Sequence, residues 1–166
     1  SLSIADRQPL MDDDSSTILG DTYVNAPPIL SNLDGNPTFI EGGTPVVLDA
    51  DVTVSDAGLD VLNGGSGDYD GASVTLVRDI SANANDVFSF NEGNDITLVG
   101  GTFLQKSGAT IAIFDTTTIP GELKVTFTNS GGQTPTSADI DYILQQITYA
   151  NSSDTPPASV QIDWSF

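Results

Sequence analysis

The chain has 166 residues and a mass of 17.3 kDa, which is enough for one domain with a substantial core. Its 23 acidic and four basic residues give a net charge of −19, which excludes binding to nucleic acid or to an anionic membrane through a basic surface. The chain has no His and no Cys, so Ser-His or Cys-His catalysis, imidazole or thiolate zinc sites and disulfides are excluded as well. The remaining chemistry is that of carboxylates, hydroxyls, carbonyls and the hard cations that they bind.

Residues 1–27 differ from the rest of the sequence. Residues 11–16 are polar and acidic, and apolar positions in this segment are scattered. We therefore predict a linker or lead-in over residues 1–27, with one edge strand at most. The run Asn25-Ala26-Pro27-Pro28 favours an extended backbone and removes N–H donors, which suits a boundary. A single domain is predicted over residues 28–166.

Short runs rich in Val, Ile, Thr and Phe alternate with turn residues from there on. Alternation with period two is clearest at residues 74–76, 123–127 and 160–166, and Gly100-Gly101 predicts a two-residue hairpin turn. The last run reaches the end of the chain, so we expect the chain to be cut from a longer protein. The predicted strands cover residues 38–40, 46–48, 52–55, 72–78, 87–90, 96–99, 102–104, 109–115, 122–128, 148–150 and 158–166.

One segment has helical periodicity instead. Thr136 is a predicted N-cap, with Asp139 three residues further on. Four apolar residues then follow at helical spacing, namely Ile140, Ile143, Leu144 and Ile147. The pattern predicts one short helix that covers the core of an all-β, antiparallel β-sandwich. No apolar run is long enough to cross a bilayer, and direct membrane insertion is not expected.

Most of the acidic residues stand singly among the predicted strands and turns. Asp is common in turns and at helix caps, so these residues are interpreted as surface, turn or cap residues. They are Asp79, Asp86, Asp95, Asp115, Asp139, Asp141 and Asp163. Lys106 and Lys124 are expected to face solvent.

A smaller set of acidic residues stands at predicted strand ends and in glycine-rich loops. Glu41 precedes two glycines, Asp56 closes a strand and is followed by Asp60, and Asp68 and Asp70 lie between glycines. If these loops meet at one end of a sandwich, their carboxylates repel one another unless a cation neutralises them. Ca²⁺ binds six to eight oxygens in a flexible geometry, which suits ligands from scattered loops. The pattern indicates a calcium site.

Five segments occur in an order that resembles a known family. They are residues 25–28 (NAPP), 39–43 (FIEGG), 52–56 (VTVSD), 69–75 (YDGASVT) and 147–153 (ITYANSS). The set resembles the cadherin-like tandem repeats of large secreted or outer-membrane adhesin-type proteins of Gram-negative bacteria, which often occur beside repeat-in-toxin segments.

The resemblance implies a Greek-key sandwich of the cadherin or immunoglobulin type, with Ca²⁺ bound at its poles. By analogy the ligands are Glu41, Asp56 and Asp70, with Asn25 from the linker and Asp60 and Asp68 as additions. The implied function is that of a calcium-binding structural and adhesion module at the bacterial cell surface or secreted from it. Its partners would be neighbouring repeat modules and a cell-surface protein or glycan.

Two other functions are alternatives to this one. A carbohydrate-binding module would use Tyr69, Tyr149 or Trp164 as stacking faces, but Trp164 is in period with apolar neighbours, which favours a place in the core. A glycosidase needs two carboxyl groups, one of them buried with a raised pKa. The acidic residues here are expected in open loops, so no enzymatic activity is predicted.

Overall fold

The computed structural model describes residues 26–166. Asn25 and the rest of the predicted lead-in up to residue 25 lie outside this range. The elements in chain order are β1 (Ile29–Ser31), β2 (Val46–Val47), β3 (Thr53–Ser55), α3 (Leu62–Gly65), β4 (Ser73–Arg78), β5 (Asp86–Phe90), β6 (Ile96–Val99), β7 (Phe103–Lys106), β8 (Ala109–Asp115), β9 (Glu122–Phe127), α4 (Ser137–Gln145), β10 (Ile147–Asn151) and β11 (Ile162–Ser165).

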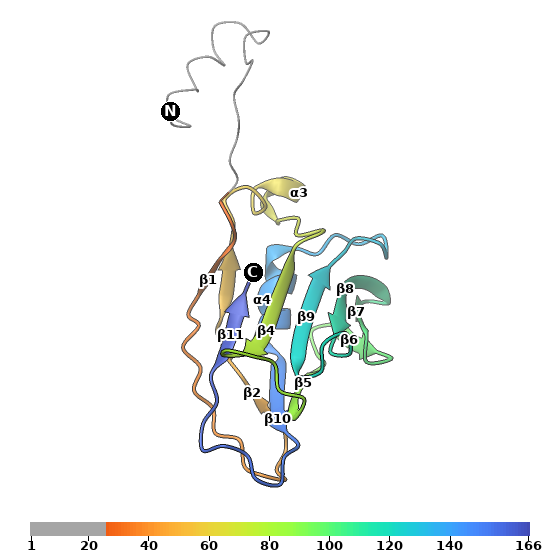
Figure 1. The fold of residues 1–166 in the computed structure, drawn as a ribbon. Coiled ribbons are helices and arrows are strands. Elements are labelled where there is room, and N and C mark those ends of the chain that lie inside the picture. Colours follow the sequence, from red (N-terminus) through yellow and green to blue (C-terminus); the bar gives the residue numbers. More distant parts are fainter. Residues whose placement is uncertain (1–25) are drawn as a thin grey trace, which may run out of the picture.

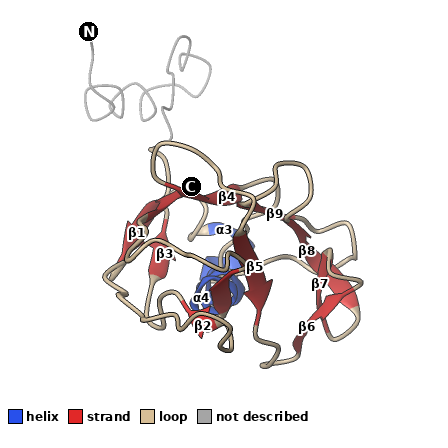
Figure 2. Cartoon of the chain, turned by 60° about the horizontal axis from the view of Figure 1, so that its bottom comes forward, coloured by secondary structure: helices blue, strands red, loops and turns tan. Residues whose placement is uncertain are grey.

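The strands form three sheets, and every strand pair is antiparallel. A six-stranded sheet has the order β11-β4-β9-β8-β7-β6, a three-stranded sheet has the order β2-β10-β5, and β1 pairs with β3 alone. In Figure 2 the large sheet curves from β4 over β9 and β8 to β6, with α4 and β2 on its inner side. The predicted all-β, antiparallel sandwich is confirmed, whereas its Greek-key connectivity stays a prediction.

The core follows the predicted alternation of apolar residues. Val74 and Leu76 of β4 are fully buried, and they pair with Val125 and Leu123 of β9, which are also fully buried. Ile162 and Trp164 of β11, and Phe166 directly after it, pack against this core with part of their surface exposed. Because successive strand residues face opposite sides, one apolar face per strand is enough to build the interior.

Helix α4 begins where the sequence predicts it. The Thr136 hydroxyl accepts the Asp139 N–H, and the Asp139 carboxylate accepts the Thr136 N–H, which is a complete capping box. Ile140, Ile143 and Leu144 are fully buried, so the predicted apolar stripe faces the core. Neither helix in residues 26–166 is long and apolar enough to span a membrane.

Several local predictions need correction. Residues 38–40 form no strand, because β2 takes the edge position beside β10 and leaves them no ladder partner. Strand β1 follows Pro28 directly and was not predicted, nor was the short helix α3, so the domain has two helices and not one. Gly100 and Gly101 do turn the chain between β6 and β7 with positive φ, but Val99 pairs with Phe103, which makes the connection three residues long.

Candidate metal centre

Three carboxylates come together where the loop after β1 meets the segment that precedes β3. Asp34, Asp49 and Asp51 each place one oxygen within 4.8 Å of the other two. Among residues 26–166, this is the only group of three or more acidic, His or Cys residues with such a spacing. Asp49 is 3% exposed, whereas Asp34 and Asp51 are at the surface. Two oxygens on opposite sides of a Ca²⁺ ion are about 5 Å apart, so the group is close enough to hold a metal ion.

The Asp49 carboxylate assembles this group through backbone hydrogen bonds. Its Oδ2 accepts the N–H groups of Asp34 at 3.0 Å and Gly35 at 2.7 Å. Its Oδ1 accepts the N–H groups of Asp51 at 3.1 Å and Val52 at 2.8 Å. Charged hydrogen bonds of this kind are stronger than neutral ones. The side chain therefore ties the loop after β1 to the segment that enters β3, and it brings Asp34 and Asp51 together.

The close approach depends on a glycine. A Cβ atom on Gly35 would lie 2.1 Å from the carbonyl oxygen of Leu48 and 3.0 Å from Oδ2 of Asp49. A carbon atom does not fit at the first of these distances, so the loop reaches Asp49 only with glycine at this position.

The electrostatics of the group favour a cation. Desolvation raises the pKa of Asp51, and so do repulsion from the carboxylates of Asp34 and Asp49 and a hydrogen bond between its carboxyl and that of Asp49. The ion pairs formed within residues 26–166 are Arg78–Asp86 and Lys106–Asp139, and neither reaches this group. A hard divalent cation bound by carboxylate oxygens would offset the repulsion that the raised pKa reports.

Two of the ligands predicted from the sequence also lie together, near α3. Oδ2 of Asp60 accepts the N–H of Asp56 at 2.9 Å. Oδ1 of Asp60 accepts the hydroxyls of Tyr69 at 2.7 Å and Ser137 at 2.8 Å. Burial raises the pKa of Asp60, but these three hydrogen bonds outweigh it, so the pKa lies below its ordinary value.

Asp56 is buried, and only one of its two carboxylate oxygens accepts hydrogen bonds. Its Oδ1 accepts the N–H groups of Gly58 at 2.8 Å and Leu59 at 2.7 Å. Its Oδ2 is buried and accepts no hydrogen bond from any residue in the 26–166 range. A buried carboxylate oxygen without a partner destabilises the fold, because its desolvation is not compensated by a hydrogen bond.

The other predicted ligands are more scattered. Oδ1 of Asp68 accepts the Asp70 N–H at 3.0 Å, and Oδ1 of Asp70 accepts the Asn129 N–H at 2.9 Å. Glu41 is exposed in the loop between β1 and β2, which runs to the end of the molecule opposite α3 (Figure 1). No three of the described predicted ligands come within 4.8 Å of one another, and ligation by Asp56 and Asp60 stays a prediction.

Sequence reasoning missed Asp34, Asp49 and Asp51. The signal was present as Asp-Ala-Asp at residues 49–51 directly before a strand, and as the turn pair Asp34-Gly35. The two segments are 15 residues apart, and nothing in either pattern indicates that they meet.

Two of the acidic residues interpreted as surface, turn or cap residues are buried, although Asp139 does take part in the cap of α4. Asp86 is 4% exposed and accepts hydrogen bonds from Arg78, Tyr149 and Asn151. Asp139 is 2% exposed, completes the capping box of α4 and pairs with Lys106 at 2.5 Å. Burial of these charges is possible because each one has a cationic partner, and Lys106 is therefore not a free solvent-facing lysine.

The three aromatic residues considered as stacking faces have different surroundings. Tyr69 is completely buried and Tyr149 is 5% exposed, so neither presents a face to a ligand. Trp164 is only partly buried and lines a cavity. Comparisons with protein-family models, with curated proteins and with solved structures give no match.

Proposed function

We propose that this domain is a calcium-binding structural and adhesion module of a large extracellular bacterial surface protein. The observation that carries the proposal is the convergence of Asp34, Asp49 and Asp51 within 4.8 Å, without a basic side chain paired to them in the described range. The partners we propose are neighbouring modules of the same chain and a cell-surface protein or glycan.

The three residues have different tasks in this proposal. Asp49 already accepts four backbone N–H groups, which occupy most of the acceptor capacity of a carboxylate, so it mainly positions the loops. Asp34 and Asp51 are exposed and supply the free ligand oxygens, and waters and carbonyl oxygens complete the coordination shell. A shell with few protein ligands at the surface suits the weak affinity of extracellular modules, with a Kd of about 10⁻⁴–10⁻³ M.

Calcium would stabilise the module by linkage, because the ion binds the folded loops and not the unfolded chain. At a hundredfold excess over Kd the gain is about 2.7 kcal/mol. The ion would also fix the loop after β1 to the segment before β3, and β1 is the first described strand. A module stiffened near its entry strand suits a chain of modules that transmits force between a cell and a surface.

A second calcium position, at Asp56 and Asp60, is part of the proposal. Its support is the buried Oδ2 of Asp56, which accepts no hydrogen bond from residues 26–166. Ile29 pairs with Ser55, so the start of β1 lies beside the residue before Asp56. Asn25, which lies outside the described residues, stays a proposed further ligand.

Thermal unfolding in calcium and in chelator tests the proposal. We expect calcium to raise Tm by roughly 5–10 °C, which corresponds to the linkage gain for a domain of this size. Asp34→Asn and Asp51→Asn should remove most of this increase, while Asp154→Asn, an exposed residue outside both positions, should keep it. Asp56→Asn reports on the second position separately. A Tm of the unchanged domain that is the same in calcium and in chelator would refute calcium binding.

A further inference from the structure

One lysine of the domain contacts a buried carboxylate. Lys106 lies on β7 opposite Ile96 of β6, which is fully buried, so its side chain leaves the sheet on the core side. Its Nζ lies 2.5 Å from Oδ1 of Asp139 in the first turn of α4, 33 positions further along the chain. The Asp139 side chain is 2% exposed and that of Lys106 is 28% exposed. The pair therefore joins the six-stranded sheet to the helix on its inner side (Figure 2).

The other oxygen of Asp139 is held by hydrogen-bond donors. Oδ2 accepts the Thr136 N–H at 3.1 Å and the Thr136 hydroxyl at 2.8 Å. Both donors lie at the N-terminus of α4, where the helix dipole also favours negative charge. Such donors stabilise the charge that develops on a carboxyl oxygen when a nucleophile attacks its carbon. Oδ1 accepts a hydrogen bond only from Lys106 among residues 26–166, so it is the oxygen free to leave.

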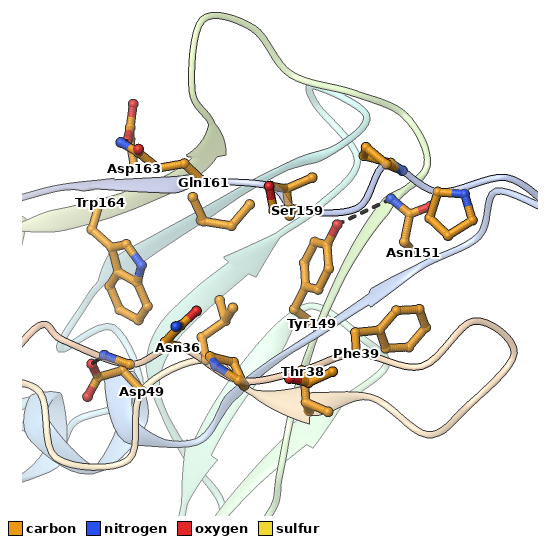
Figure 3. A pocket seen from close by; sticks show the side chains of 18 of the residues that line it. Asn36, Thr38, Phe39, Asp49, Tyr149, Asn151, Ser159, Gln161, Asp163 and Trp164 are labelled. Carbon is orange, nitrogen blue, oxygen red and sulfur yellow. Dashed lines mark hydrogen bonds between the residues drawn. The ribbon is translucent and has the colours of Figure 1, made fainter.

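The surroundings of the pair are apolar and closed. Ile96 beside Lys106, and Ile140 and Ile143 beside Asp139 on α4, are fully buried. Neither member of the pair lines the cavity of about 760 Å³ between residues 33–39 and 156–164, which is shown in Figure 3. Passing a proton from Nζ to Oδ1 removes two charges, and this is less unfavourable where little water solvates them.

We propose that Lys106 and Asp139 form an isopeptide bond, an amide between Nζ and Cγ. The ammonium first passes a proton to Oδ1, and the resulting amine attacks Cγ while the Thr136 donors stabilise the charge on Oδ2. Oδ1 then leaves as water with two of the three Nζ protons, and the third stays on the amide nitrogen. One positive and one negative charge disappear together, so no co-reactant is needed. Holding the two groups in contact supplies the high effective concentration that condensation requires.

The other side chains of this kind lack the chemistry. Arg78 and Asp86 are equally close, at 2.5 Å, but a guanidinium keeps its proton and does not act as a nucleophile. Lys124 is exposed and forms no ion pair with any residue of the described range. The bond goes beyond calcium binding and does not depend on it, because no residue of either calcium position takes part.

Mass spectrometry of the denatured chain tests the bond after the folded domain has stood for several days at neutral pH in chelator. We expect a mass lower by one water molecule. Trypsin cuts after Lys and Arg, so it should leave residues 79–124 uncut at Lys106 and joined to residues 125–166. Lys106→Arg keeps the positive charge but cannot form the bond, and it should have its full mass. Lys124→Arg is the matched control and should still lose water.

Three results would overturn the isopeptide bond. They are a full mass for the unchanged domain, the same loss of water in Lys106→Arg, and a loss that maps to Asp34-Gly35 or Asp70-Gly71, where an Asp-Gly pair can dehydrate to a succinimide. The branched peptide from the unchanged domain decides the question even if Lys106→Arg does not fold. Because the bond is read from the mass of the unfolded chain and calcium binding from thermal unfolding, either proposal can fail while the other stands.

Discussion

At the scale of single residues, Asp49 has the largest structural role in the candidate metal centre. It is buried, it carries a charge, and it accepts four backbone N–H groups from two separate segments. A carboxylate in this position is satisfied by the backbone and does not need a metal to be tolerated. The need for a cation comes instead from its two neighbours, Asp34 and Asp51, whose charges have no such compensation from residues in the described range.

Asp49→Asn tests this role directly. The amide nitrogen of Asn would face two backbone N–H groups that have no other acceptor, so we expect a loss of about 2–3 kcal/mol in the free energy of unfolding. Urea denaturation in chelator measures the loss without any contribution from calcium. Asp154→Asn removes the same charge from the surface and should change stability by less than about 0.5 kcal/mol. A small effect of Asp49→Asn would mean that the loops are held together by other contacts.

The raised pKa of Asp51 predicts how calcium binding depends on pH. Its pKa is raised above the ordinary 3.8, so in the metal-free domain its charge destabilises the fold at neutral pH, and protonation relieves this as the pH falls through the raised pKa. Protons and calcium therefore compete for the same oxygens. We expect the rise in Tm caused by calcium to be largest at neutral pH and to shrink with acidification, starting above pH 3.8. A calcium effect that stays constant down to that pH would contradict a role for Asp51 as a ligand.

At the scale of secondary structure, α4 shows how far local sequence determines an element. The cap at Thr136 and the apolar spacing that follows it are local features, and both were predictable. The strands were predictable for the same reason, since alternation is visible in each run by itself. The edges were not. Residues 38–40 have strand-like composition, but the sheet edge was already taken by β2, which is a property of the whole sheet.

Thr136→Ala measures the contribution of the cap to stability. The change removes the hydroxyl that accepts the Asp139 N–H, and we expect a loss of about 1 kcal/mol in the free energy of unfolding. Thr136→Ser keeps the hydroxyl and should retain most of the stability. If Ser and Ala were equally destabilising at this position, the loss would come from packing of the methyl group and not from the cap.

At the scale of the whole molecule, a buried ion pair joins the two main sheets. Arg78 lies on β4 of the six-stranded sheet, and Asp86 begins β5 of the three-stranded sheet. The guanidinium donates from Nε at 2.8 Å and from Nη2 at 2.5 Å, and the Tyr149 hydroxyl donates to the same carboxylate at 2.6 Å. The pair therefore connects strands that pack across the core.

Arg78→Met should strongly destabilise the domain. It leaves the buried Asp86 carboxylate without a cation, for an expected loss of about 3–5 kcal/mol in urea unfolding. Adding Asp86→Asn removes the orphaned charge and should recover part of the loss. Lys124→Met, which removes an exposed cation on β9, is the matched control and should have little effect. A similar small effect for Arg78→Met would show that the pair does not hold the sheets together.

The candidate site was less predictable than the fold because it depends on how separate segments meet in the whole molecule. Hydrophobic alternation repeats along each strand, so every run carries its own signal. The contact between Asp34 and Asp49 joins two turns, and it forms only because Gly35 lets the backbone approach Leu48 and Asp49. The predicted ligands Asp56 and Asp60 did come together, since they lie in one loop, whereas Glu41 belongs to a loop directed to the other end of the domain (Figure 1).

The most direct measurement is an anomalous difference map from crystals of the domain grown in chelator and then transferred into calcium. The account predicts a peak within about 2.3–2.6 Å of carboxylate oxygens from Asp34 and Asp51, with Asp49 still bonded to the four backbone N–H groups. A peak beside Oδ2 of Asp56 as well would place the second ion. A map with ordered loops and no calcium peak between Asp34 and Asp51 would contradict the account.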